Sequence, residues 1–151
     1  MFSSFVNQFY RTHSVSIFYG YGHGKFSLPV IYTTGYDSLP SSLASGDFNN
    51  DNYIDLAITN YDTNNVGILF ENSNRTFEKQ IVFSTELDFH PYSIAAGQFN
   101  DDEFADIAIA NSETHEIGVL LNNANRTFAN QATYSVGYAS PYTVDVQDFN
   151  Q

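Results

Sequence analysis

The chain has 151 residues, enough for one ordinary hydrophobic core, and carries 17 acidic against 5 basic residues for a formal net charge of −12. This charge disfavours nucleic acid as a partner, because phosphate binding needs clustered Lys and Arg. The chain has no cysteine, which excludes disulfides and thiolate metal sites, and no apolar run approaches the roughly 20 residues that span a bilayer, so we expect no direct membrane insertion of this segment.

Residues 1–34 are interpreted as the end of an incomplete repeat unit. The segment SVSIFYGYGHGKF (14–26) aligns with NVGILFENSNRTF (65–77) and with EIGVLLNNANRTF (116–128), so that the period is 51 residues. This register predicts a third strand at 14–19 and a fourth at 26–32. Residues 4–10 fall where a second strand is expected, but SFVNQFY matches that strand poorly.

Residues 35–85 contain a whole unit. Small residues before position 47 predict a first strand, and DLAITN (55–60) alternates in the manner of a second. A third strand is predicted over 65–72 and a fourth over 76–84, with turn residues between them. No segment has the spacing of a helix.

Residues 86–136 repeat this pattern, and residues 137–151 start a further, truncated unit. In that last unit Val144, Asp145, Val146 and Gln147 replace the small residues of the first strand, so we expect a distorted end.

Four short antiparallel strands in about 50 residues predict the blade of an all-β propeller. A propeller closes with 4–8 blades, so this chain is a partial propeller. We expect either a fragment of a longer protein or a ring completed with other copies. Open blade edges would favour self-association.

The loop DFNNDNYID (47–55) joins the first strand to the second and has the composition of a calcium site. Calcium takes six to eight oxygen ligands, and alternate residues of a tight loop can point to one centre. Positions one, three, five and nine, with the carbonyl of position seven, give the predicted ligands Asp47, Asn49, Asp51, Asp55 and Tyr53. The alternative is a plain Asx-type turn without metal.

The second loop, QFNDDEFAD (98–106), is a weaker candidate. It keeps Asn100, Asp102 and Asp106, but Gln98 replaces the first aspartate. Position six favours a left-handed residue, which suits Asn52 in the first loop and not Glu103 in the second. A third loop opens at Asp148 and is cut off at the end of the chain.

DFNNDNYIDLAITN and QFNDDEFADIAIAN resemble the FG-GAP/VCBS repeats found in integrin α-chain propellers and many extracellular proteins. The resemblance implies a calcium-binding β-propeller at the cell surface or outside the cell. It implies the ligand set already named, and Gln98 and Glu103 depart from its pattern.

Asn-Arg-Thr occurs at Asn74 and Asn125, the same position in two units. Each is an N-glycosylation sequon on a predicted exposed turn, in a secreted protein. The alternative is that the tripeptide serves only as a turn.

The resulting functional hypothesis is a non-catalytic, calcium-stabilised adhesion scaffold that binds a protein or a glycan. Repeated acidic loops are typical of structural sites, whereas an active site usually occurs once. The alternatives are the propeller region of a larger secreted enzyme and an intracellular protein-interaction propeller.

Overall fold

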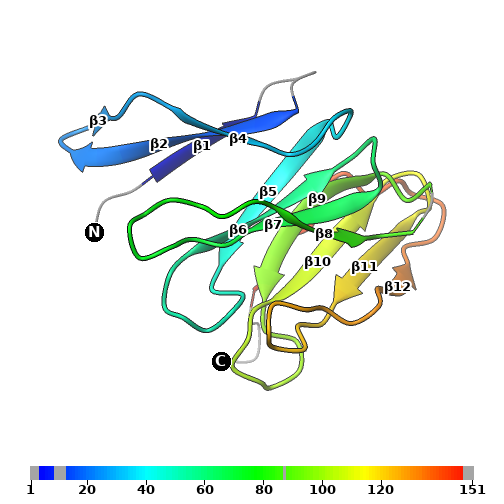
Figure 1. Ribbon diagram of the computed structural model, residues 1–151. Helices are drawn as coiled ribbons and strands as arrows, with labels where there is room; N and C mark the ends of the chain where they lie inside the picture. The colour runs from blue at the N-terminus through cyan, green and yellow to red at the C-terminus, as the bar shows by residue number, and fades with distance from the viewer. Residues whose placement is uncertain (1–3, 9–12, 87, 148–151) are drawn as a thin grey trace.

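The computed structural model describes residues 4–8, 13–86 and 88–147, and every regular element in these ranges is a β-strand. The strands form three antiparallel sheets of four, arranged one after another through the molecule (Figure 1). This confirms the prediction of an all-β fold built from blades of four antiparallel strands. The described residues contain no helix with the length and hydropathy needed to cross a bilayer.

The first sheet consists of β1 (Ser4–Gln8), β2 (Ser14–Gly22), β3 (Lys25–Phe26) and β4 (Val30–Thr33). β2 pairs with each of the other three. The single strand predicted over 26–32 is wrong, because it is divided into β3 and β4. Pro29 lies between them, and a proline cannot donate to a strand ladder. The weakly matching segment at the N-terminus does form a strand.

The second sheet has the order β5 (Pro40–Gly46), β6 (Asp55–Asn60), β7 (Asn65–Leu69) and β8 (Ile81–Ser84). Its third and fourth strands are shorter than predicted. Beyond them, Glu71 and Phe77 form an isolated bridge. Continuous pairing stops between this bridge and β8, where the side chain of Gln80 lies over Gly67.

The third sheet contains β9 (Pro91–Gly97), β10 (Asp106–Asn111), β11 (Glu116–Leu120) and β12 (Ala132–Ser135). Its register repeats that of the second sheet, because Ala108 pairs with Val119 as Ala57 pairs with Ile68. Residues 137–147 form no strand, although a first strand was expected in this segment.

The hydrophobic core lies between neighbouring sheets. Every residue of β6 is buried, and its side chains alternate between the two faces of the sheet. Leu56 and Ile58 pack with Val15 and Ile17 of β2, whereas Ala57 belongs to a second cluster with Ile107 and other residues of the third sheet. The middle sheet is therefore stabilised from both faces.

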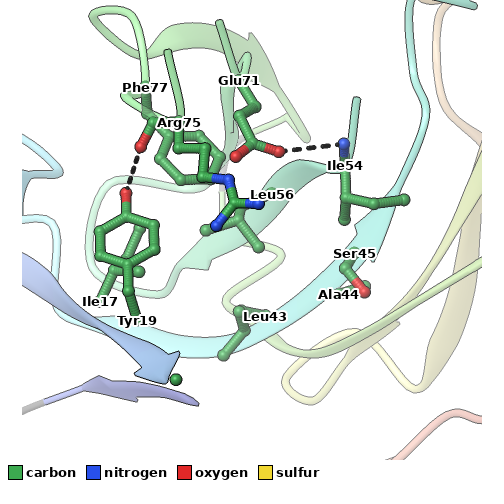
Figure 2. Close-up of a pocket in the computed structure, with 11 residues that line it drawn as sticks. Ile17, Tyr19, Leu43, Ala44, Ser45, Ile54, Leu56, Glu71, Arg75 and Phe77 are labelled. Atoms are coloured by element: carbon green, nitrogen blue, oxygen red, sulfur yellow. Dashed lines mark hydrogen bonds between the residues drawn. The ribbon is translucent and has the colours of Figure 1, made fainter. Parts of the chain in front are cut away.

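A cavity of about 670 Å³ remains between the first and second sheets. Tyr19, Leu43 and Phe77 line it, and the Tyr19 hydroxyl donates to the Arg75 carbonyl at 2.6 Å (Figure 2). Burial, followed by the hydrogen bond with Tyr32, raises the pKa of Tyr19. Tyr19 therefore stays neutral at physiological pH.

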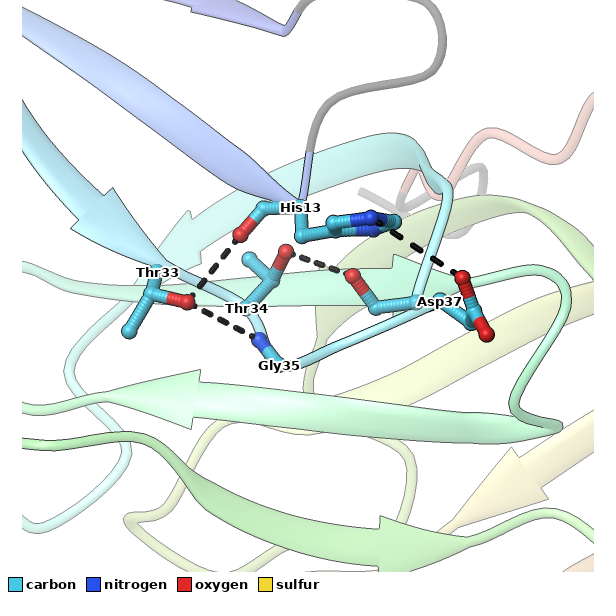
Figure 3. A network of polar contacts seen from close by, with 6 residues as sticks. His13, Thr33, Thr34, Gly35 and Asp37 are labelled. Atoms are coloured by element: carbon cyan, nitrogen blue, oxygen red, sulfur yellow. Dashed lines mark hydrogen bonds and ion pairs between the residues drawn. The ribbon is translucent and has the colours of Figure 1, made fainter.

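A polar network ties the chain entering β2 to the segment that follows β4 (Figure 3). The His13 carbonyl accepts hydrogen bonds from the Thr34 amide at 2.8 Å and from the Thr33 hydroxyl at 3.2 Å. The two later units repeat the backbone bond, from Thr85 to Asn64 and from Val136 to His115. The period is therefore present in hydrogen bonding as well as in sequence.

Candidate metal site

The first acidic loop, residues 47–55, curls tightly between β5 and β6. The backbone amide of Asp51 donates to Asp47 Oδ1 at 3.1 Å and to Asn49 Oδ1 at 3.2 Å. Side-chain oxygens from positions one and three therefore converge on the same amide. The second oxygen of Asp47 accepts from the Asn52 amide at 2.8 Å, and Asp51 Oδ1 accepts from the Tyr53 amide at 2.8 Å. The structure thus brings the side chains of positions one, three and five together.

The curl needs left-handed backbone at two positions of this loop. Asn50 has a φ of 59° and Asn52 a φ of 66°. Asparagine tolerates this conformation better than most residues other than glycine. Position six is therefore left-handed in the first loop, as its asparagine led us to expect.

Asp55, at position nine, closes the loop from inside the protein. Its side chain is fully buried. One carboxylate oxygen accepts from the Phe48 amide at 3.0 Å and the other from the Glu71 amide at 2.8 Å. Asp55 therefore joins the start of the loop to the end of β7, and each oxygen keeps a second lone pair for another partner.

Burial and the neighbouring carboxylates both disfavour the ionised form of Asp55. The pKa of Asp55 is raised from its ordinary value of 3.8 to about 6. Burial is the largest cause, the two backbone hydrogen bonds lower the pKa, and the charges of Asp51 and Asp47 raise it. A divalent cation in the loop would offset both the burial and the repulsion.

The second loop, residues 98–106, has the same buried aspartate at position nine. Asp106 is fully buried and accepts from the amides of Phe99 and Asn122, each at 2.8 Å. Asn100 donates to Asp102 at 2.8 Å, as Asn49 donates to Asp51 at 2.9 Å in the first loop. Positions three, five and nine are therefore equivalent in the two loops.

The two loops differ at positions one and six. Within the described ranges, no hydrogen bond joins the side chain of Gln98 to its loop, whereas Asp47 binds two amides. Asp101, at position four, is left-handed with a φ of 57°, but Glu103 at position six is not. The second loop is consequently less tightly curled around a centre.

Glu71, which the sequence reasoning missed, is a further carboxylate beside the first loop. It accepts from the Ile54 amide at 3.2 Å. One period later stands Asn122, whose side-chain amide donates to the carbonyls of Phe48 and Ala105 at 2.9 and 3.1 Å. A signal was present in the sequence, since Glu71 and Asn122 occupy the same repeat position, near the end of the third strand, and both are polar.

The donors of the first loop fit calcium by their chemistry. In the part of the chain that the structure describes, no three Asp, Glu, His or Cys side chains gather as a metal cluster. A site here therefore depends on mixed oxygen donors, which are the amide of Asn49 and the carbonyl of Tyr53 beside the carboxylates. Calcium accepts this combination, and its flexible coordination tolerates an irregular loop.

A second cavity, of about 680 Å³, borders the first loop. Asp51 and Tyr53 line one side, and Asn125 and Arg126 line another. Arg126 pairs with Glu78 at 2.8 Å and lies 3.9 Å from the centroid of the Phe70 ring. The loop of one unit and the turn of the next thus share a concave surface.

The two sequons lie on exposed turns. The side-chain oxygen Oδ1 of Asn74 accepts from the backbone amide and the hydroxyl of Thr76 at 3.1 and 2.7 Å. Asn125 is exposed in a left-handed turn with a φ of 52°. The third acidic loop, which opens at Asp148, lies outside the described residues.

Residues 47–109 match the family model described as FG-GAP-like repeat. This segment is an FG-GAP-like repeat. The match begins at the first acidic loop and ends within β10, so it includes both loops, and it confirms the expected resemblance. No curated protein and no solved structure matches the chain. The repeat match, together with the three four-stranded antiparallel sheets, indicates a β-propeller-like repeat domain.

Proposed function

We propose that this domain is a calcium-stabilised extracellular scaffold with no catalytic role, and that it binds a protein or a glycan in adhesion. One observation carries the calcium proposal: the side-chain oxygens of Asp47 and Asn49 converge on a single amide next to the carboxylate of Asp51. Bound calcium would supply the positive charge that these groups and Asp55 lack. Asp47, Asn49, Asp51, Asp55 and the Tyr53 carbonyl would hold it.

The scaffold role is supported by how the acidic loops are used in the fold. In both units the ninth residue of the loop joins the first strand to the end of the third. A cation in such a loop would stabilise a blade, and the exposed surface would remain free for a ligand. Weak extracellular-type sites, with Kd on the order of 10⁻⁴–10⁻³ M, would fill outside the cell and not in the cytosol.

Calorimetric titration of the EGTA-treated protein with calcium chloride tests the proposal. We expect saturable binding that Asp51→Asn abolishes, because it removes one central carboxylate. The matched control is Asp102→Asn, the same change at the same position of the second loop, and it should leave the first site intact. No binding heat in the wild type, or equal loss of binding in both variants, would contradict the assignment of the first loop.

Glycosylation of Asn74 and Asn125 belongs to the same proposal, since it requires passage through the secretory pathway. Native material should lose mass when treated with a peptide N-glycosidase. Asn74→Gln and Asn125→Gln should each remove one part of that loss. Native protein with the mass of the bare chain would contradict the extracellular assignment.

A further inference from the structure

The two sequons have different surroundings, although they occupy the same position of two successive units. The side-chain oxygen of Asn74 is held by the amide and the hydroxyl of Thr76. In the later unit the Thr127 hydroxyl donates instead to the Ala124 carbonyl at 3.0 Å, and in the described part of the chain no hydrogen bond holds the side chain of Asn125. Asn125 also lines the second cavity, of about 680 Å³, and Asn74 does not.

This cavity is bounded by the first acidic loop of one unit and by the sequon turn of the next. Tyr53, which is 39% exposed, and Phe104 supply aromatic surface. Asn49, Asn72 and Ser73 add side-chain amide and hydroxyl groups. The volume lies in the range of about 300–1,000 Å³ that small-molecule sites occupy, and aromatic surface beside a few polar groups is typical of such sites.

The charges of the lining favour an uncharged occupant. Three carboxylates, those of Asp51, Glu71 and Glu78, line the cavity beside one cation, Arg126. The guanidinium is held by Glu78 at 2.8 Å and lies 3.9 Å from the centroid of the Phe70 ring. Its Nε is buried and has no acceptor among the described residues. An anionic ligand would be repelled, whereas a neutral sugar can accept from the guanidinium and donate its hydroxyl groups to the carboxylates.

We propose that the N-acetylglucosamine attached to Asn125 lies in this cavity, with its apolar face on the ring of Tyr53. Asn125 Nδ2 loses a proton and forms the bond to C1 of the sugar, while the lipid-pyrophosphate carrier that donates the sugar leaves. The C–H bonds of a sugar ring are attracted to the negative face of an aromatic ring. Because the sugar is tethered at the cavity, its effective concentration there is on the order of millimolar.

The sugar of Asn125 would connect two units across their interface. Asn125 belongs to the unit of residues 86–136, whereas Tyr53 lies in the loop of the preceding unit. A group that binds only the folded arrangement stabilises it, so this sugar stabilises the interface between the two units. The sugar of Asn74 makes no such contact. The inference rests on the glycosylation proposed above and is independent of calcium binding.

Variants with a single sequon provide the test. Secretion of the whole chain from cells that add only high-mannose glycans, followed by endoglycosidase H, leaves one N-acetylglucosamine on each occupied sequon, and the intact mass measures the occupancy. The same variants made in bacteria carry no sugar, so effects of the substitutions on the backbone cancel. In EGTA, the sugar should raise the Tm of Asn74→Gln, which keeps Asn125, by about 2–4 °C. In the matched control Asn125→Gln, which keeps Asn74, the rise should be less than about 1 °C.

The aromatic contact is tested in the Asn74→Gln background. Adding Tyr53→Ala should abolish the rise in Tm that the sugar gives, and adding Tyr134→Ala, on the exposed outer strand β12, should preserve it. Nuclear Overhauser contacts should join protons of the sugar to the ring of Tyr53.

The outcomes separate this inference from the proposal on which it rests. An unmodified Asn125 in secreted protein would overturn both. A modified Asn125 whose sugar gives no rise in Tm, gives no more than the sugar of Asn74, or shows no Overhauser contact with Tyr53 would overturn this inference alone. The same holds if the rise persists in Tyr53→Ala.

Discussion

At the residue scale, the two buried aspartates carry the most structural information. Asp55 and Asp106 each satisfy two backbone amides that lie on different segments of a unit. An unpaired buried amide costs about 1–3 kcal/mol. These two side chains therefore stabilise the loops whether or not a metal is bound.

Asp106→Ala should lower the free energy of unfolding by about 2–4 kcal/mol in EGTA, because it leaves the amides of Phe99 and Asn122 without acceptors. Urea unfolding measures the change. Asp101→Asn, at an exposed position of the same loop, is the control and should change stability by less than about 1 kcal/mol, because asparagine also tolerates the left-handed backbone of this position. Equal effects of the two substitutions would show that the buried hydrogen bonds are not what stabilises the loop.

The pKa of Asp55 predicts a pH dependence in the absence of calcium. Its value of about 6 in the folded protein lies above the ordinary 3.8, so folding disfavours the ionised form. The stabilising contribution of this carboxyl group is fully present below about pH 4 and is lost as the pH rises through about 6.

Urea unfolding in EGTA between pH 4 and pH 7, for the wild type and for Asp55→Asn, isolates this contribution. The stability of the wild type relative to the variant should fall as the pH rises. Calcium should reduce the fall, because it favours the carboxylate. If the stability of the wild type relative to Asp55→Asn stays constant or rises with pH, ionisation of Asp55 does not destabilise the folded protein.

At the element scale, alternation predicted the buried central strands well. β6 is buried along its whole length. Its two faces pack against two neighbouring sheets, so the alternation of its side chains in the sequence already indicates which residues face each sheet. The outer strands were predicted less well, because their ends depend on distant contacts. The side chain of Gln80 lies over Gly67 and donates to the carbonyl of Thr34 at 3.1 Å. No pattern in the local sequence predicts either contact.

Gly67→Ala should lower the free energy of unfolding by about 1–3 kcal/mol, since the new methyl group would overlap the side chain of Gln80. The backbone of Gly67 is not left-handed, so the overlap is the cause of the loss. In a Gln80→Ala background the same substitution should be nearly neutral, and a double-mutant cycle measures the coupling. An additive cycle would contradict this explanation.

The acidic loop was predictable for a different reason. Its donors are close in sequence, so spacing alone indicated that positions one, three and five would meet. Glu71 was missed because it approaches the loop only where β7 ends opposite Asp55, and that contact depends on the sheet. The left-handed Asn50 was also missed, since the usual rule concerns position six.

At the scale of the whole molecule, one unit is repeated in sequence, strand register and hydrogen bonding. The bond from residue 78 to residue 70 recurs as Ala129 to Leu121 and as Ser27 to Tyr19. Such a chain is stabilised by neighbouring units in turn, so a metal in one loop should affect the adjoining interfaces as well. The net charge of −12 adds a general repulsion that bound calcium would reduce.

Calcium binding in the loop of residues 47–55 is tested most directly by thermal unfolding. For a Kd on the order of 10⁻⁴–10⁻³ M, 10 mM calcium should stabilise the protein by about 1.4–2.7 kcal/mol. This corresponds to a rise in Tm of about 3–10 °C over EGTA. The rise should vanish in Asp51→Asn and persist in Asp102→Asn. An unchanged wild-type Tm in calcium, or an equal rise in Asp51→Asn, would contradict calcium binding in this loop.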